Sequence, residues 1–225
     1  MAGIRLDLHV HSHHSPDSSL SVETIVTHLT ARGLNGFALT DHNTTAGLVE
    51  LAECQVKVPE LILVPGVEVS TLEGHLLLYG VREAPPARRP VAETIEWARA
   101  RGAIPVLAHP LRRSHGVGRT VAESAAVTAI ESVNGHNSPR ANRRAVALAV
   151  GRKLATTGGS DVHELSDLGR AYTEFAEGTS NVENVLDALR SGRTTGAGSA
   201  PDFPERVRLE WRTMLLRLRR GLRPI

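Results

Sequence analysis

Short apolar runs alternate with amphipathic stretches along most of the chain. The apolar runs predict strands at residues 4–8, 37–40, 61–69, 75–79, 104–108, 129–133 and 154–157, and within 168–175. Apolar residues at helical spacing, with start and stop signals around them, predict helices at residues 21–33, 44–57, 91–101, 119–125, 139–150 and 181–191. Since strands and helices take turns, we expect parallel strands that are joined by helical crossovers. Six or seven such units favour a closed barrel over an open sheet.

The segment after the first strand argues against an open, doubly wound sheet. Such a sheet usually carries a glycine-rich phosphate loop at this point, whereas residues 8–12 contain no glycine. Residues 82–90 contain three prolines and are typical of a surface loop, not of a linker between domains. We therefore expect an α/β fold with a single, TIM-barrel-like domain.

Composition supports one globular domain and excludes several functions. The chain has 225 residues, of which 41% are hydrophobic and 22% charged. Aromatic residues make up only 3%, which argues against a base-stacking surface for RNA or single-stranded DNA. The single cysteine, Cys54, excludes an internal disulfide. No apolar segment is long enough to cross a membrane or to act as a secretion signal, so we expect a cytoplasmic protein.

Positive charge is concentrated at the C-terminal end. Residues 201–225 contain seven arginines and three acidic residues, a net charge of +4, which leaves −2 for the rest of a chain whose net charge is +2. We therefore divide the chain into a barrel, residues 1–200, and a basic helical tail, residues 201–225. This charge distribution does not favour nucleic-acid binding by the main body, although it leaves that role open for the tail.

Residues 205–223 within this tail predict a helix. Its apolar residues recur at helical spacing: Val207, Trp211, Leu215 and Leu218. This stripe suits a helix that packs on the barrel or on another subunit. The surrounding arginines also permit contact with nucleic acid or an anionic membrane surface.

Histidines and carboxylates recur at the ends of the predicted strands. His9 and His11 follow the first strand, and Asp161 and His163 repeat that spacing after the strand at 154–157. In an extended segment, residues i and i+2 point to the same face, so each pair can bind one ion. Other strand ends carry His42, Glu68, His75 and His109. Because imidazole and carboxylate are ligands of zinc, manganese and iron, this set predicts a metal site at one end of the sheet.

The order and context of these motifs resemble the PHP (polymerase and histidinol phosphatase) domains. The resemblance covers nearly the whole chain and rests on Asp7-Leu8-His9-Val10-His11-Ser12, Thr40-Asp41-His42-Asn43, Gly66-Val67-Glu68-Val69, Ala108-His109-Pro110 and Gly159-Ser160-Asp161-Val162-His163. It implies a distorted (β/α)7 barrel with a trinuclear metal centre at the C-terminal ends of its strands.

The resemblance also implies which residues hold each ion. A first ion would be held by His9, His11, Glu68 and Asp161. A second ion, bridged by Glu68, would also bind His75 and His109, and a third would bind Asp17, His42 and His163. His14 is an alternative to Asp17, because some members of the family have a histidine there. Two or three divalent ions, manganese, zinc or iron, are therefore the expected cofactors.

Such a centre suits the hydrolysis of phosphate esters. Neighbouring divalent ions lower the pKa of a bridging water to about 7 and neutralise phosphate oxygens. We therefore expect a metal-bridged hydroxide to attack phosphorus, with Glu68 and Asp161 as essential ligands. Arg112 and Arg113, just beyond His109, are either binders of a second anionic group of the substrate or solvated loop charges.

The strand end at residues 131–137 adds further candidates. Asn134 and Asn137 are similar to family residues that orient the substrate. His136 is a candidate proton donor to the leaving group, with a surface position as the alternative. For His13, His28 and His115 we expect ordinary exposed positions.

Three function classes are compatible with the sequence. The first is a phosphoesterase, either a phosphomonoesterase or a phosphodiesterase, that acts on a small phosphorylated metabolite or nucleotide. The second is an amidohydrolase-like enzyme for substrates other than phosphate esters. Such centres often use a carboxylated lysine, but neither lysine of this chain, Lys57 or Lys153, ends a predicted strand beside a motif. The third is an accessory factor in nucleic-acid processing that uses the basic tail.

Overall fold

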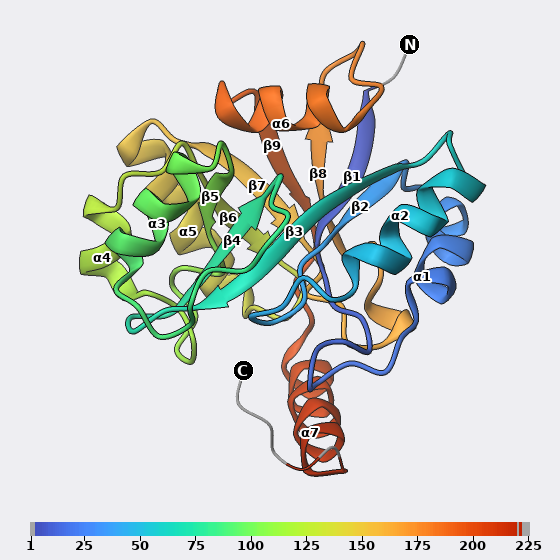
Figure 1. The fold of residues 1–225 in the computed structure, drawn as a ribbon. Coiled ribbons are helices and arrows are strands. Elements are labelled where there is room, and N and C mark those ends of the chain that lie inside the picture. The colour runs from blue at the N-terminus through green and yellow to red at the C-terminus, as the bar shows by residue number, and fades with distance from the viewer. Residues whose placement is uncertain (1–2, 220, 222–225) are drawn as a thin grey trace.

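The protein is described by a computed structural model for residues 3–219 and 221 (Figure 1). The strands are β1 (Ile4–Val10), β2 (Gly36–Leu39), β3 (Ile62–Ser70), β4 (His75–Tyr79), β5 (Ile104–Leu107), β6 (Ala129–Asn134), β7 (Ala155–Gly159), β8 (Ala171–Phe175) and β9 (Thr194–Gly198). The helices are α1 (Val22–Leu29), α2 (Leu48–Lys57), α3 (Val91–Ala100), α4 (Gly118–Ser124), α5 (Pro139–Arg152), α6 (Val182–Arg190) and α7 (Phe203–Arg219), with 3-10 turns η1 (Thr30–Arg32) and η2 (Leu165–Asp167).

These strands form one sheet that curls into a nearly closed barrel (Figure 1). Their order is β7-β6-β5-β4-β3-β2-β1-β8-β9. Strands β1 to β3 pair in parallel, and so do β5 to β7. Strands β8 and β9 also pack against β7, which brings the two edges of the sheet together. The expected TIM-barrel-like α/β fold is thus confirmed.

The expectation of parallel strands throughout is wrong for two strands, β4 and β8. Strand β4 runs antiparallel to β3 and β5, and β8 runs antiparallel to β1 and β9. Strands β3 and β4 form a hairpin, whose turn is closed by a 2.8 Å hydrogen bond from the Thr71 N–H to the Gly74 carbonyl. A hairpin reverses the chain without a helical crossover. Strand β9 lies outside the predicted strands because its sequence, Thr-Thr-Gly-Ala-Gly, has no apolar alternation.

Two glycines allow the edges of the sheet to approach each other. A Cβ atom at Gly196 would lie 2.3 Å from the carbonyl oxygen of Thr157, and one at Gly158 would lie 2.3 Å from that of Tyr172. A larger residue at either position would therefore push the closing strands apart. The N–H of Gly196 donates to Oγ1 of Thr156 at 2.9 Å, which links β9 to β7.

Apolar residues form the core of the barrel, and polar residues gather at one of its two ends. On the outside, α1 and α2 pack on β1, β2 and β3, while α3 and α4 cover β4 and β5. Inside, apolar side chains of the central strands pack against α6, which closes one end. Helix α7 extends from the opposite end (Figure 1). This second end is where the C-terminal ends of the parallel strands place their polar residues.

Helix α7 is present, but its apolar stripe does not pack on the barrel, so that expectation is wrong. Val207, Trp211, Leu215 and Leu218 are 36%, 57%, 47% and 49% exposed. Buried Leu209 faces the barrel instead, and two ion pairs flank it: Arg170 with Glu205 at 2.6 Å and Arg212 with Glu164 at 2.8 Å. Packing of the stripe on another subunit stays a prediction, as does the domain boundary at residue 200.

The predicted tail helix extends past the described residues. Arg220 and Arg223 lie outside the described residues. None of the helices in residues 3–219 combines the length and the apolar character needed to cross a membrane.

Candidate metal centre

The polar residues at the C-terminal ends of the strands meet in one buried cluster. His9 lies at the end of β1 and His11 directly follows that strand, while Glu68 comes from β3 and His75 from the start of β4. His42, His109, Asp161 and His163 follow β2, β5 and β7. The sequence places these residues at strand ends, and closure of the barrel brings them within contact of one another.

Backbone conformation contributes to this convergence at two positions. His109 and Asp161 have φ angles of 28° and 61°, in the left-handed region that residues other than glycine rarely adopt. Such strain is typically retained where it aims a functional side chain. The N–H of Asp161 donates to the carbonyl of His9 at 2.8 Å, which holds this conformation against β1.

Glu68 is the centre of the cluster. Its Oε1 lies 2.9 Å from Nδ1 of His75 and 3.0 Å from Nε2 of His109. Its Oε2 lies 3.1 Å from Nε2 of His9, 3.1 Å from Nδ1 of His42 and 3.3 Å from Nε2 of His11. Burial would raise the pKa of Glu68, but the surrounding histidines hold it well below its usual value. The carboxylate is therefore ionised, as a metal ligand must be.

Asp161 is a second carboxylate, beside Glu68, that lies close to several histidines. Its Oδ1 lies 3.4 Å from Nε2 of His11 and 3.6 Å from Nε2 of His9. Ligand atoms of His9, His11, Glu68 and Asp161 all lie within 4.8 Å of one another. Burial opposes ionisation of Asp161, but His9 and Arg112 hold its pKa well below the usual value. The structure thus brings together the four residues expected for a first ion.

Asp17 is a third carboxylate that lies close to two histidines. Its Oδ2 lies 3.1 Å from Nε2 of His163 and 3.3 Å from Nε2 of His42. Burial opposes a charge on Asp17, yet these two histidines lower its pKa. His14, the alternative ligand, does not face this cluster, because its Nε2 lies 3.5 Å from Glu50 on α2. The geometry therefore favours the aspartate.

The pKa values of the histidines differ with their surroundings. Burial lowers the pKa of His109, with Arg112 acting in the same direction, and burial also lowers that of His42. For His9, His11 and His163, nearby carboxylates outweigh burial and raise the pKa, in His11 to about 10. A cluster of this kind draws protons or cations to balance its carboxylates.

Several metal-donor atoms of the cluster lie close to one another but make no hydrogen bond, which tests whether cations fit. They are Nε2 of His9 and His11, Oδ1 of Asp17, Nδ1 of His42 and His109, and Oε2 of Glu68. Each is buried and makes no hydrogen bond to the described residues. Since an unsatisfied buried polar atom costs about 1–3 kcal/mol, so many in one place indicate a missing binding partner. Imidazole and carboxylate donors of this number suit two or three divalent ions.

Glu131 is a supporting residue outside the set predicted from the sequence. Its Oε1 lies 2.9 Å from Nδ1 of His9, and its Oε2 accepts from the N–H of His109 at 2.8 Å and from Nδ2 of Asn134 at 2.9 Å. This carboxylate fixes the ring of His9 so that Nε2 faces the centre. The available signal in the sequence was the one charged residue within the predicted strand at residues 129–133.

Asp41 supports the loop after β1 in a similar way. It accepts from the Ser12 N–H at 2.7 Å, the Ser12 hydroxyl at 2.7 Å and the Ser15 hydroxyl at 2.9 Å. Ser15 in turn lies 3.1 Å from Nδ1 of His11. Asp41 belongs to the Thr40-Asp41-His42 motif, but its role depends on contacts that only the folded chain provides.

Arg112 is held at the edge of the cluster. Its guanidinium donates to Asp161 at 2.6 Å and to Asn137 at 2.8 Å, and it also hydrogen-bonds Asn134. Asn134 and Asn137 therefore contact Arg112, an arrangement in which they position this cation. Arg113 is exposed and does not reach the cluster. It lines an adjoining groove instead.

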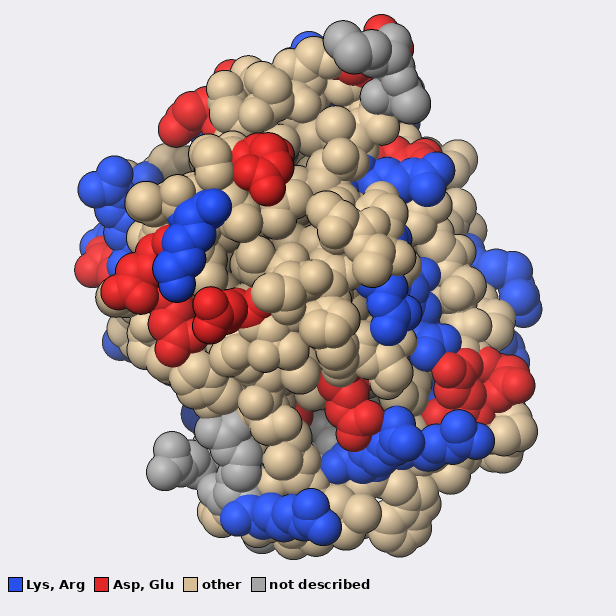
Figure 2. Space-filling model, turned by 90° about the vertical axis from the view of Figure 1, so that its right-hand side faces the viewer, with Lys and Arg blue, Asp and Glu red and all other residues tan. Residues whose placement is uncertain are grey.

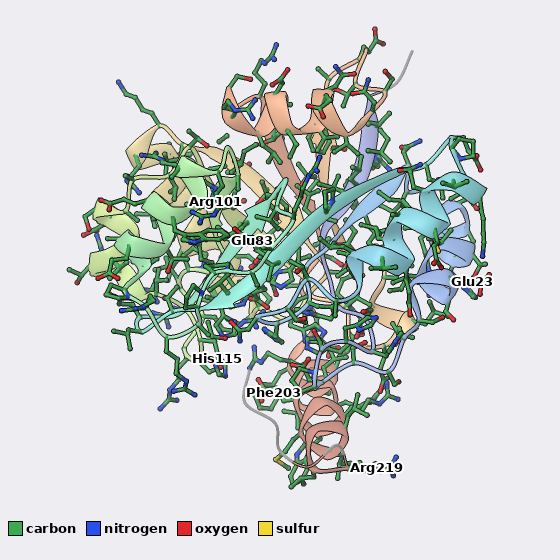
Figure 3. All side chains as sticks on the ribbon, viewed as in Figure 1. Glu23, Glu83, Arg101, His115, Phe203 and Arg219 are labelled. Atoms are coloured by element: carbon green, nitrogen blue, oxygen red, sulfur yellow. The ribbon has the colours of Figure 1, made fainter. Side chains whose placement is uncertain are left out.

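His136 and His115 stand at the mouth of the centre. The cluster opens into a cavity of about 330 Å³ that these two residues line together with Glu210 and Met214 of α7. His136 Nε2 lies 3.4 Å from Asp167, and burial lowers its pKa although Asp167 opposes the shift. His115 is exposed, as expected, but its ring lies 4.8 Å from that of His75, on the side of the barrel that faces α7 (Figure 3).

The chain is similar in sequence to known proteins. The family model described as PHP domain matches residues 7–101, and the one described as PHP-associated matches residues 139–194. A 5'-3' exoribonuclease of Salmonella typhimurium is 35% identical over 115 residues, which are 48% of this chain and 38% of that protein. A phosphoribosyl 1,2-cyclic phosphate 1,2-diphosphodiesterase of Eggerthella lenta is 38% identical over 87 residues, 36% of this chain and 32% of that enzyme. The chain thus spans about a third of each of these enzymes.

A solved structure shares the whole fold. The crystal structure of PsfC from Pseudomonas syringae has a TM-score of 0.73 at 19% sequence identity, and the match covers 97% of this chain and 99% of that one. This likeness extends over the barrel and most of the region that contains α7.

Proposed function

Because the chain belongs to the PHP-domain family of metal-dependent phosphoesterases, we propose that it hydrolyses the phosphate ester of a small phosphorylated metabolite or nucleotide. The observation that carries this proposal is Glu68, one buried carboxylate with five imidazole nitrogens within 3.3 Å. Buried polar atoms are normally hydrogen-bonded, so the several donor atoms around this carboxylate that make no hydrogen bond support a metal-binding role.

The proposed ligands fall into the three groups that the resemblance implies. They are His9, His11, Glu68 and Asp161; Glu68, His75 and His109; and Asp17, His42 and His163. When bound, manganese, zinc or iron ions supply Lewis-acid charge that acidifies water and neutralises the oxygens of an anionic ester. The contribution of the chain is a rigid set of donors, held by Glu131, Asp41 and the backbone of β1.

His136 is the proposed proton donor to the leaving group. It faces the cavity beside Asp167, and in the free protein burial keeps its pKa below the usual value. An anionic substrate in the cavity would place negative charge beside the ring and raise that pKa. The proton would therefore be bound together with the substrate and be available for the departing oxygen.

The groove beside the cavity favours a substrate with a second anionic group. It has a volume of about 780 Å³, and Arg112 and His136 line both spaces. Its other basic residues are Arg113, Arg140, Arg144 and Arg206. Because Asp161 already pairs with Arg112, the arginines farther along the groove are the candidates for a second phosphate or carboxylate.

The two alternative functions have less support. Lys57 is exposed on α2, and Lys153 follows α5, so neither lysine lies in the cavity where an amidohydrolase-like centre would use it. On the side of the molecule where α1 and α2 lie, basic and acidic side chains are interspersed (Figure 2). That face offers no continuous positive field for nucleic acid.

A substrate screen tests the proposal. Chelated protein reloaded with manganese, zinc or iron should release phosphate or an alcohol from phosphomonoesters or phosphodiesters, and chelation should abolish the reaction. Arg113→Met should raise KM roughly fivefold for a substrate with two anionic groups and leave KM unchanged for substrates with one such group. A fivefold change corresponds to about 1 kcal/mol of binding free energy, the contribution of one exposed ion pair. Hydrolysis of amides in the absence of any phosphate-ester turnover would instead favour the amidohydrolase-like alternative.

A further inference from the structure

A second group of metal-ligating side chains lies outside the Glu68 cluster. It consists of His13 and His14, in the loop after β1, and Glu50, in the first turn of α2. Their ligand atoms lie within 4.8 Å of one another. None of these three residues lines the cavity above the Glu68 cluster. We propose that His13, His14 and Glu50 form a separate binding site for one zinc ion.

The distances fit a zinc ion. Nε2 of His13 lies 3.4 Å from Oε1 of Glu50, and Nε2 of His14 lies 3.5 Å from the same oxygen. A tetrahedral zinc ion with bonds of about 2.1 Å keeps its ligand atoms about 3.4 Å apart. Two of the three separations thus already have this value, and the third is within 4.8 Å.

The chemistry of the donors also fits. Two imidazoles and one carboxylate form a ligand set that zinc accepts, with its fourth position open to water. Nε2 of His14 is buried and makes no hydrogen bond within the described part of the chain, although it faces Glu50. The two imidazole rings lie 4.2 Å apart, and Nε2 of each is within 3.5 Å of the same oxygen of Glu50.

The loop that carries the two histidines is already ordered by its own hydrogen bonds. The N–H of His13 donates to the carbonyl of Leu20 at 2.7 Å, and the N–H of His14 donates to the hydroxyl of Ser12 at 3.3 Å. Ser12 is in turn held by Asp41. An ion would therefore bind to a formed site and lose little conformational entropy in ordering the loop.

The position of the site gives it a structural consequence. His13 and His14 lie between His11 and Asp17, which belong to the Glu68 cluster, while Glu50 belongs to a helix on the outside of the barrel. A bound zinc ion would tie this loop to α2. The site would thus hold in place the segment that carries His11 and Asp17, two proposed ligands of the Glu68 cluster.

Metal content tests the proposal without relying on activity. Full-length protein is freed of metal, dialysed against excess Co²⁺ as a spectroscopic substitute for zinc, and analysed for ions per chain and for visible absorption. His13→Gln and Glu50→Gln remove ligands from two different elements, and both side chains are more than a third exposed, so the fold should persist. Each variant should hold one ion fewer per chain than the wild type and lose the absorption of one tetrahedral Co²⁺.

Two matched variants control for nonspecific effects. His28→Gln removes another exposed histidine, on α1, and Glu53→Gln removes another exposed glutamate of α2. Both should bind as many ions as the wild type, and all four variants should retain the ions of the Glu68 cluster. Equal metal content in the wild type and in His13→Gln and Glu50→Gln would overturn the proposal, and so would an equal loss in the two controls.

Discussion

The Glu68 cluster and helix α7 lie at the same end of the barrel but are held in opposite ways. The cluster is formed by residues that are at most 7% exposed and that come from strands distant in the sequence. Helix α7 is one continuous segment that touches the barrel through Leu209 and two ion pairs. A change in the cluster should therefore affect many contacts at once, whereas a change in α7 should stay local.

Replacement of Glu68 should have the largest effect. Glu68→Ala removes the carboxylate that five imidazole nitrogens share, so we expect phosphate-ester hydrolysis to fall by roughly a thousandfold or more, the scale of losing metal catalysis. Turnover and metal content of the purified variant measure this. Asp161→Ala should lose activity in the same way. Near-normal turnover in either variant would contradict the central role of these carboxylates.

Replacement of Glu131 should have a smaller effect, because Glu131 orients the proposed ligand His9 and does not itself bind an ion. Glu131→Gln weakens the hydrogen bond that orients His9, and a loss of such a supporting carboxylate typically costs 10–100-fold in metal affinity or activity. Metal titration should therefore show weaker binding, with kcat largely recovered at saturating metal. If kcat stayed low at saturating metal, Glu131 would have to act on the reaction itself.

The stability of the metal-free protein should depend on pH because of the cluster. Burial would lower the pKa of His11, but hydrogen bonds with Asp161 and Glu68 raise it to about 10. Since this folded-state pKa lies above the unfolded value of 6.5, the stability it contributes is fully present below that value and is lost as the pH rises toward 10. His9 and His163 act in the same direction, because nearby carboxylates raise their pKa too.

His42 and His109 do not oppose this trend in the alkaline range. Their pKa values are lowered by burial, so both are neutral in the folded and unfolded states above about pH 7.5. We expect the Tm of metal-free protein to fall by roughly 5 °C or more between about pH 7.5 and 9.5. Metal-loaded protein should lack this fall, because the ions bind deprotonated imidazoles. A flat Tm in metal-free protein would contradict the raised pKa of His11.

Removal of α7 should have the smallest effect. Deletion of residues 204–225 exposes the surface beneath Leu209 and breaks two partly exposed ion pairs. We expect this to lower the free energy of unfolding by about 2–3 kcal/mol and Tm by roughly 4–10 °C. Turnover of small substrates should change less than tenfold, since Glu210 and Met214 only line the mouth of the cavity. Unchanged turnover with lost binding of DNA or RNA would support the accessory role of the tail.

The sequence predicted elements well where one local signal was sufficient. Helix α1 begins after Ser21, whose hydroxyl accepts from the Thr24 N–H at 3.1 Å as an N-cap should. The apolar strands of the barrel were also predicted from a local signal, namely their runs of apolar residues. Strand β9 was not, because Gly196 is required by the close approach to β7 and Gly198 by that to β8, contacts that leave no periodic pattern. The stripe on α7 had the right period, but period alone does not say what a helix face contacts.

The sequence by itself determined which residue types stand at the strand ends, because strand pattern and spacing are local properties. It therefore pointed to eight of the nine proposed ligands before any contact among them was known, and the resemblance to the PHP domains added Asp17. Only the tertiary structure decided that Asp17 and not His14 faces His42 and His163, that Glu131 supports His9, and that His115 lies beside His75. These outcomes depend on barrel closure, on the hairpin of β3 and β4 and on the direction in which each loop leaves its strand. The physical reason is that a side chain acquires its partners from segments far away in the chain, and their approach is set by packing and not by the residues beside it.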